Sequence, residues 1–205
     1  MLSYPGNEPN AAIPPPNRQT MTTQIPNYGS MSPSGLRQTR LIGVPMFDFN
    51  LSYEMMKSNE IRSLQAFFLQ TGGPEKSFSY IDILKSNPVG NPGASVPMVN
   101  GAGQIGDVLS TTGWEFDRDG LLVAGDIFTI NNDLKVYTVT KNVTSNDLGI
   151  ADINIEPSLL ISPLNLELLT IYNVSFNCNF TISNLSVDTF YPYFSSLSIR
   201  FSESI

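Results

Sequence analysis

Side chains that commonly do chemistry are scarce in this chain of 205 residues. It contains no histidine, and Cys178 is its only cysteine. The absence of histidine removes the commonest general base and metal ligand, and it makes a histidine-dependent catalytic triad impossible. A single cysteine excludes an intrachain disulfide. Because Cys178 lies in an alternating run, we predict a buried thiol that acts as a small apolar side chain.

Acidic residues cluster in one stretch, at Glu115, Asp117, Asp119 and Asp126. Glycosidase chemistry needs two carboxyl groups, one of them with a raised pKa, and no local feature here would raise one. The run Asp117-Arg-Asp119-Gly120 matches part of a calcium-binding loop, but the further acidic ligands and the terminal glutamate are missing. We therefore expect a turn at this point and no metal site.

The run from Gly101 to Gly106 has the letter pattern of a dinucleotide-binding loop. Such a loop must leave a parallel strand and begin a helix, whereas the residues from Asp107 to Gly113 are β-branched and turn-forming. We predict glycine turns between strands, with Trp114 as an anchor of the local core rather than a ligand platform. No catalytic residue, cofactor site or metal site is expected, and the chain is expected not to be an enzyme.

Composition narrows the class of protein further. Hydrophobic residues make up 41% and charged residues 14% of the chain, and the formal net charge is −7. A protein that wraps nucleic acid needs clustered Lys and Arg, which are scattered here. The acidic balance suits a conduit that DNA slides through, and it equally suits ordinary solubility. No secretory signal or long apolar run is present, so we expect a cytosolic product without stable membrane association, unless a particle carries it out.

The first 35 residues are rich in proline and poor in apolar periodicity. Proline fixes φ and removes a backbone donor, so residues 1–35 are predicted to form an extended arm. Two interpretations remain open, a loose terminus or an arm that becomes ordered only against a neighbouring subunit. The candidate assembly contacts are the few anchor side chains in the arm: Tyr4, Ile13, Ile25 and Tyr28.

Alternation and helical spacing define the elements that follow. Phe47 to Tyr53 alternates apolar and polar residues, as a half-buried strand does. A helix is predicted to end at Gly72-Gly73, with Ile61, Leu64 and Phe68 on its buried stripe. Further strands are predicted at residues 76–84, 166–182 and 191–203.

The middle of the chain contains five short predicted strands with tight turns, near residues 95–99, 107–111, 125–130, 135–140 and 151–155. Turn-rich joints at residues 85–94 and 157–165 flank them. We therefore predict a mostly β protein: a β-barrel or sandwich belt domain with one α-helix, formed by residues 36–87 and 166–205, and an inserted small β-barrel domain formed by residues 88–165.

Several motifs have counterparts in one family. They include the Gly101–Gly106 loop, Gly113-Trp114, Leu122-Val-Ala-Gly-Asp126, Lys135-Val-Tyr-Thr-Val139, Val143-Thr-Ser-Asn-Asp147, Gly149, Ile153-Asn-Ile-Glu-Pro157, Ala66-Phe-Phe-Leu69 before Gly72-Gly73, and Ile199-Arg-Phe201. Together they resemble the distal tail proteins of tailed bacteriophages, over roughly residues 30–205. The middle segment is also similar to accessory β-domains of some phage coat proteins.

The resemblance implies a structural virion protein, assembled in the host cytoplasm. It implies a ring, expected to be a homohexamer, at the distal end of the tail tube, with DNA passing through its lumen. The expected partners are other copies of the chain, the tail tube protein, and baseplate hub, fibre or spike proteins. The alternatives are a glycan-binding or receptor-binding β-module of a tail fibre or spike, and another ring component such as an adaptor or terminator. A virion-borne hydrolase is a further alternative, disfavoured by the missing histidines.

Overall fold

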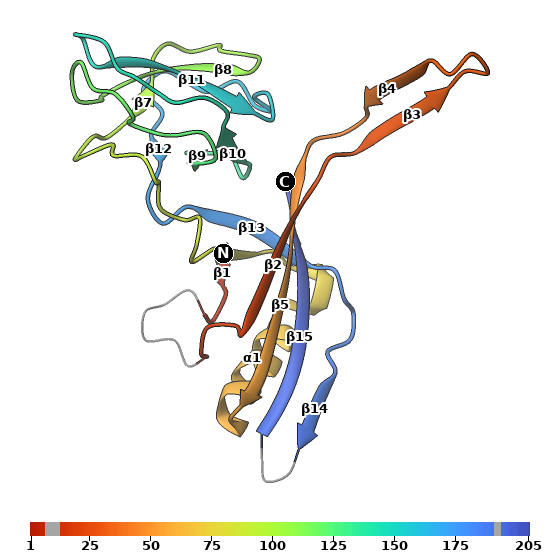
Figure 1. The fold of residues 1–205 in the computed structure, drawn as a ribbon. Coiled ribbons are helices and arrows are strands. Elements are labelled where there is room, and N and C mark those ends of the chain that lie inside the picture. The colour runs from red at the N-terminus through yellow and green to blue at the C-terminus, as the bar shows by residue number, and fades with distance from the viewer. Residues whose placement is uncertain (7–12, 191–193) are drawn as a thin grey trace. The chain divides into compact units, whose positions relative to one another are not determined.

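The computed structural model describes residues 1–6, 13–190 and 194–205, which form two compact units (Figure 1). The first unit comprises Met1–Tyr80 and Asn177–Ser204, and the second comprises Ile81–Phe176. The described part of the chain is mostly β with one α-helix, and this confirms the predicted fold class.

A seven-stranded sheet organises the first unit, in the order β1-β6-β13-β15-β5-β2, with β14 paired to β15. Strands β3 and β4 form a separate two-stranded hairpin. The bounds of these elements are β1 Leu2–Ser3, β2 Arg18–Gln24, β3 Asn27–Met31, β4 Arg37–Leu41, β5 Met46–Met56, β6 Phe78–Ile81, β13 Ser175–Phe180, β14 Val187–Phe190 and β15 Phe194–Glu203.

The long strands β5 and β15 supply the centre of this sheet, and both alternate as predicted. Phe47, Phe49, Leu51 and Tyr53 of β5 are buried, whereas the residues between them are half-buried. Pairs such as Phe49 and Phe201 lie opposite each other, with ring centroids 5.4 Å apart. Period-two alternation places one face of each strand on the core, where aromatic rings contribute most of the buried apolar area.

One α-helix, α1 (Ser58–Thr71), follows β5 directly. Its start is fixed by Glu60, whose carboxylate accepts the backbone N–H of Lys57 at 2.7 Å. Its end is fixed by Gly72, which has a φ of 67° and begins the short 3-10 helix η1 (Gly73–Glu75). Backbone positions with a positive φ favour glycine, because a Cβ atom is sterically unfavourable in the left-handed region. The predicted helix end is therefore confirmed.

The buried stripe of α1 differs from the prediction by one residue. Ile61 and Leu64 are buried as expected, but the third residue of the predicted stripe is Phe67 and not Phe68. The Phe67 ring lies edge-on to Tyr4 and Phe78, whereas Phe68 is half-buried. The three-residue spacing from Leu64 places Phe67 on the buried stripe. Phe68 lies at the margin of the stripe, where its ring centroid is 5.1 Å from that of buried Phe180.

The prediction of an extended arm over residues 1–35 is corrected, because most of the described residues in this range belong to the first unit. β1 pairs in parallel with β6, and all seven residues of β2 pair with β5. β2 contains no proline and several threonines, which suit a strand. Without it, β5 would present an unpaired edge. Residues 7–12 of the arm lie outside the described part.

A six-stranded sheet forms the second unit, in the order β12-β9-β10-β11-β8-β7. A bridge between Met98 and Leu168, and a hydrogen bond from Val99 N to Glu167 O at 2.8 Å, nearly close this sheet into a barrel. The strands are β7 Met98–Val99, β8 Val108–Thr112, β9 Ile127–Ile130, β10 Val136–Val139, β11 Ile150–Glu156 and β12 Leu169–Thr170.

The limits of the second unit differ from the predicted domain 88–165 at both ends. Residues 81–87 and 166–176 were predicted in the belt domain, but they belong to the second unit. Two contacts explain the difference. β12 pairs with β9, and Val174 N donates to Ser86 O at 2.9 Å where the chain leaves and returns. The predicted joints marked turns inside this unit rather than its boundary.

Candidate assembly surfaces

The β3–β4 hairpin has no core of its own. All ten of its strand residues are exposed, and its turn is closed by hydrogen bonds between Ser32 and Leu36 and from Gly35 N to Ser32 O. Isolated two-stranded hairpins are marginally stable in water. We call the exposed side chains Ile25, Tyr28, Met31, Arg37, Arg40 and Leu41 the hairpin surface.

Each face of the hairpin carries one arginine beside one large apolar side chain. Met31 pairs with Arg37 on one face, and Tyr28 pairs with Arg40 on the other. Tyr28 and Met31 are 67% and 70% exposed. Residues directly opposite each other in an antiparallel pair share a face, so each pair presents a positive charge next to apolar area.

A groove lies at the far end of β5, next to β14 and β15. Its volume is about 800 Å³. We call it the β14 groove, and the lining side chains that matter below are Glu54, Met55, Asp188, Phe190, Phe194 and Leu197. It combines two carboxylates with a mainly apolar wall.

A β-bulge shapes this groove. Met56 pairs with Ser195 and Tyr53 with Leu197, so Glu54 and Met55 together oppose the single residue Ser196. Both bulge residues are exposed, and Met55 has a φ of 55°. Bulges redirect side chains, and a left-handed conformation at a non-glycine residue costs about 1 to 3 kcal/mol. The bulge thus holds an apolar side chain in solvent at an energetic cost.

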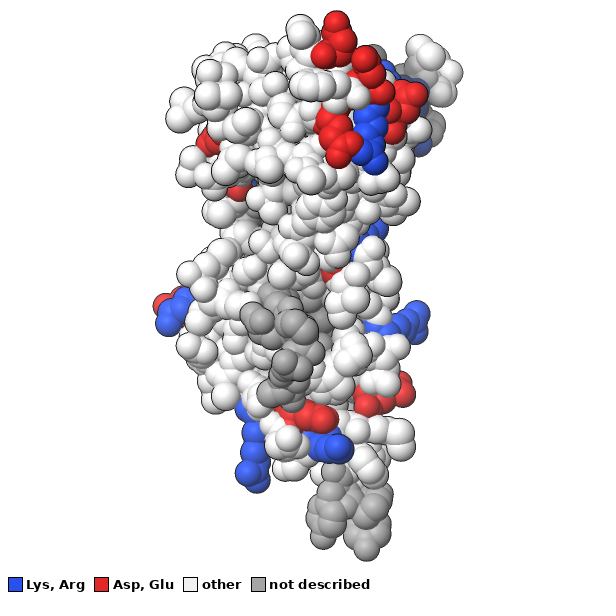
Figure 2. All heavy atoms as spheres, turned by 90° about the vertical axis from the view of Figure 1, so that its left-hand side faces the viewer, with Lys and Arg blue, Asp and Glu red and all other residues white. Residues whose placement is uncertain are grey.

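Beyond these two surfaces, much of the exterior carries no charge. Figure 2 shows one face on which uncharged residues cover most of the area, while acidic and basic side chains gather in a few groups. A surface of neutral polar groups is solvated without strong fields, so attraction between molecules depends on such local groups of charge.

The four predicted assembly contacts separate into two pairs. Tyr4 and Ile13 are 2% and 3% exposed and lie in the core of their own chain, so they are corrected to core residues. Ile25 and Tyr28 are exposed on and beside the hairpin. Tyr4 was mistaken for an anchor because apolar residues among prolines look isolated in sequence. In the fold, Tyr4 follows β1 and packs on the sheet.

Burial changes the acidity of three groups in the first unit. The hydroxyls of Tyr4 and Tyr53 lie 2.6 Å apart. Burial raises the pKa of Tyr4 well above its usual value and raises the pKa of Tyr53 to about 12. Burial, helped by the carboxylate of Glu203, also raises the pKa of Cys178. The prediction that Cys178 is buried is confirmed.

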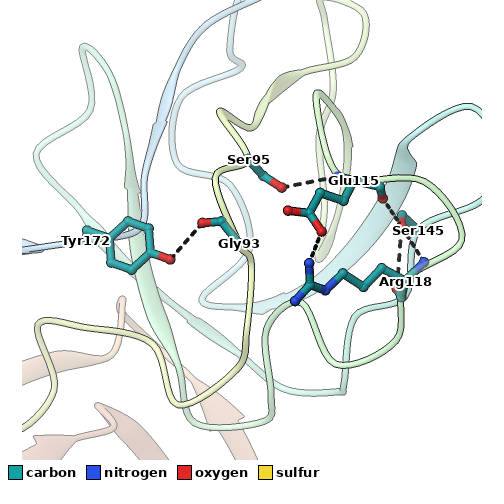
Figure 3. A network of polar contacts seen from close by, with 6 residues as sticks. All are labelled: Gly93, Ser95, Glu115, Arg118, Ser145 and Tyr172. Carbon is teal, nitrogen blue, oxygen red and sulfur yellow. Dashed lines mark hydrogen bonds and ion pairs between the residues drawn. The ribbon is translucent and has the colours of Figure 1, made fainter.

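The acidic cluster of the second unit holds loops together. Glu115 forms an ion pair with Arg118, its backbone N–H donates to Ser95 Oγ at 3.1 Å, and Ser145 Oγ donates to its carbonyl at 2.5 Å (Figure 3). Tyr172 OH donates to Gly93 O at 3.2 Å in the same region. These contacts fasten three loops to one another and to the segment that follows β12.

Asp126, the last acidic residue of this stretch, is buried. Its carboxylate accepts the backbone N–H groups of Val89 at 2.8 Å, Gly90 at 3.1 Å and Val123 at 2.8 Å. A buried carboxylate is tolerated when such donors satisfy it. The arrangement stabilises a loop junction.

The glycine-rich run is a loop before β8, as predicted. Gln104 fastens it: its Oε1 accepts Ser110 N at 2.7 Å, and its Nε2 donates to Ser110 O at 3.0 Å. Trp114 is 4% exposed in the second core, and its Nε1 donates to Thr111 Oγ1 at 2.8 Å. The prediction of a core anchor is confirmed, and the indole face is not available to a ligand.

Within the described ranges, no group of three or more Cys, Asp or Glu side chains could hold a metal ion. In the same residues, no helix is long and apolar enough to cross a membrane.

The sequence analysis did not identify Arg37, Arg40 or the β14 groove as parts of candidate assembly surfaces. Arg37 and Arg40 carry a visible signal, since no acidic residue occurs between residues 25 and 43. The bulge at Glu54 and Met55 has no such signal, because it depends on the register with β15. No protein-family model matches the chain, and no curated protein matches its sequence.

Proposed function

We propose that this chain is a non-enzymatic structural subunit of a bacteriophage tail. It forms a ring, expected to contain six copies, at the distal end of the tail tube and links the tube to baseplate, fibre or spike proteins. The observation that carries the proposal is the hairpin, whose ten strand residues are all exposed. Such an element gains its order from a partner.

The resemblance set out above gives the proposal its biological setting. It rests on motifs in both units, including the loop before β8, Trp114 and the end of β15. It implies a ring-forming belt with an inserted module. The described fold has an aromatic-rich sheet unit whose chain is interrupted by a barrel-like unit, an organisation compatible with that implication.

Charge also supports a role around DNA without binding it. The net charge of −7 and the few, scattered basic residues disfavour attraction to a phosphate backbone. A ring made of such chains would let DNA pass through its lumen without strong adhesion.

The competing function is a receptor-binding or glycan-binding module of a fibre or spike. Trp114, the one tryptophan that could serve such a module as a ligand platform, is buried. The two functions also differ in stoichiometry, since fibre and spike modules are expected as trimers.

Electron microscopy of the purified 205-residue chain tests the proposal. We expect closed rings with a central opening, and we expect these rings to bind the end of purified tail tubes. Single particles the size of one chain at micromolar concentration, or elongated trimers, would overturn it. Mass spectrometry of purified virions provides the second readout, since the chain should be present in a fixed ratio to the tail tube protein.

A further inference from the structure

We propose that the hairpin surface of one copy binds the β14 groove of a second copy. This inference deepens the proposed function and rests on it, because the same contact repeated from copy to copy would build the ring. It assigns two specific surfaces that meet head to tail.

The first argument is charge complementarity between the two surfaces. The hairpin surface contains Arg37 and Arg40, and residues 25–43 contain no acidic residue. The β14 groove contains Glu54 and Asp188 and no basic residue in its lining. In the part of the chain that is described, none of these four forms an ion pair. Chains of net charge −7 repel one another, so association needs a local attraction of this kind.

The second argument is that both surfaces expose apolar side chains beside these charges. Met55 is 73% and Phe190 is 59% exposed at the groove, while Tyr28 and Met31 are exposed on the hairpin. Aromatic residues, Met and Arg are enriched at the centres of protein interfaces. The bulge matters here, since it holds Met55 outward in a strained conformation.

The third argument is reach. The hairpin leaves the sheet where Gln24 pairs with Met46, and the groove lies at Glu54 and Met55 near the other end of β5. Eight residues of strand span about 26 Å. Figure 1 shows β3 and β4 continuing beyond β2 and β5, away from β14. A hairpin therefore cannot fill the groove of its own chain, and the occupant is another copy.

When each hairpin binds the groove of the next copy in one direction, the contact is heterologous. A heterologous contact closes into a ring when the rotation between copies is suitable and otherwise extends as an open chain. A two-fold dimer in which two copies exchange hairpins reciprocally would use the same surfaces without building a ring, so its appearance as the dominant species would contradict the proposed function.

Charge reversal in the full-length chain tests the contact. Variant H carries Arg37→Glu and Arg40→Glu, and variant G carries Glu54→Lys and Asp188→Lys. We expect each to raise the apparent dissociation constant of the assembly by about tenfold or more. A chain with all four changes should recover assembly, because both signs are reversed together.

Mixing variants H and G tests the head-to-tail geometry. In a mixture, the natural hairpin of variant G meets the natural groove of variant H, and the reversed hairpin of variant H meets the reversed groove of variant G, so opposite charges face each other at both contacts. We expect each variant alone to stay unassembled and the mixture to form assemblies that contain the two variants in equal numbers. Two control chains carry matched changes elsewhere: Arg62→Glu with Lys141→Glu, and Asp147→Lys with Asp152→Lys, all at exposed residues. Both controls should assemble like the natural chain, and circular dichroism should show all variants folded.

The outcomes separate the two proposals. If the natural chain forms rings and variants H and G assemble unchanged, the assigned contact is wrong while the proposed function stands. If variant H fails to assemble while variant G assembles normally, the groove is not the partner of the hairpin. The same conclusion follows if the fourfold variant fails to recover assembly. If the natural chain remains monomeric, the proposed function itself fails.

Discussion

The hydroxyl oxygens of Tyr4 and Tyr53 lie 2.6 Å apart inside the first core. The pair joins the end of β1 to the middle of the sheet across 49 residues of sequence. A buried hydroxyl that loses its partner is left without a hydrogen bond, which lowers the stability of the folded state. Removing both hydroxyls leaves an apolar contact without this penalty.

The first prediction concerns this pair. Tyr4→Phe and Tyr53→Phe should each lower the free energy of unfolding by about 1 to 3 kcal/mol. The double variant should lose less than the sum of the two. Urea denaturation of the four chains forms a double-mutant cycle. Additive losses would show that the two hydroxyls do not depend on each other.

The second prediction concerns alkaline pH. Burial raises the pKa of Tyr53 to about 12 and raises that of Tyr4 well above its usual value, so the folded state favours the protonated phenols. Their stabilisation is complete below pH 10 and is lost as the pH rises through about 12, because the unfolded chain ionises first. Buried Cys178 acts in the same direction from its usual value of 9.0 upward.

Unfolding free energies measured between pH 8 and pH 11 test this dependence. The slope should be negative, and it should become shallower in the Tyr4→Phe/Tyr53→Phe chain. Equal slopes in the natural chain and the doubly substituted chain would contradict the prediction.

The third prediction compares adjacent aromatic residues of α1. Phe67 is 6% exposed and contacts Tyr4, Phe78 and Phe180, so Phe67→Ala should cost about 3 to 5 kcal/mol. Phe68→Ala should cost clearly less, because that side chain is half-buried. Thermal unfolding measures both. A larger loss for Phe68→Ala would place the helix stripe one residue further along.

The fourth prediction concerns the bulge. Met55→Gly relieves the positive φ, so its unfolding free energy should stay within about 1 kcal/mol of the natural chain or exceed it. The same change removes an apolar side chain from the β14 groove and should weaken assembly. Met55→Leu is the control that keeps an apolar group there. If Met55→Gly chains assemble at the same protein concentration as the natural chain, Met55 makes no interface contact.

Strong periodicity is what made parts of this fold predictable. β5 and β15 alternate over long runs, and the end of α1 is marked by glycines, so these elements follow from local pattern. The short strands of the second unit were also predicted within a few residues, because tight turns separate them.

Other features depend on pairing between distant segments. β2 has little apolar alternation, and its place is set by the open edge of β5. The choice of Phe67 over Phe68 depends on where Tyr4 lies, and the limits of the second unit depend on β12 pairing with β9. One of the two candidate assembly surfaces was partly predictable from the sequence, because Ile25 and Tyr28 were predicted contacts. The β14 groove was not predictable, because it arises from a register shift between β5 and β15.

The central claim, that this chain assembles into a closed ring, is tested most directly by native mass spectrometry of the purified 205-residue chain. The proposal predicts one dominant species whose mass corresponds to six copies of the 22.5 kDa chain, without a ladder of larger forms. A dominant monomer or trimer at micromolar concentration would contradict it.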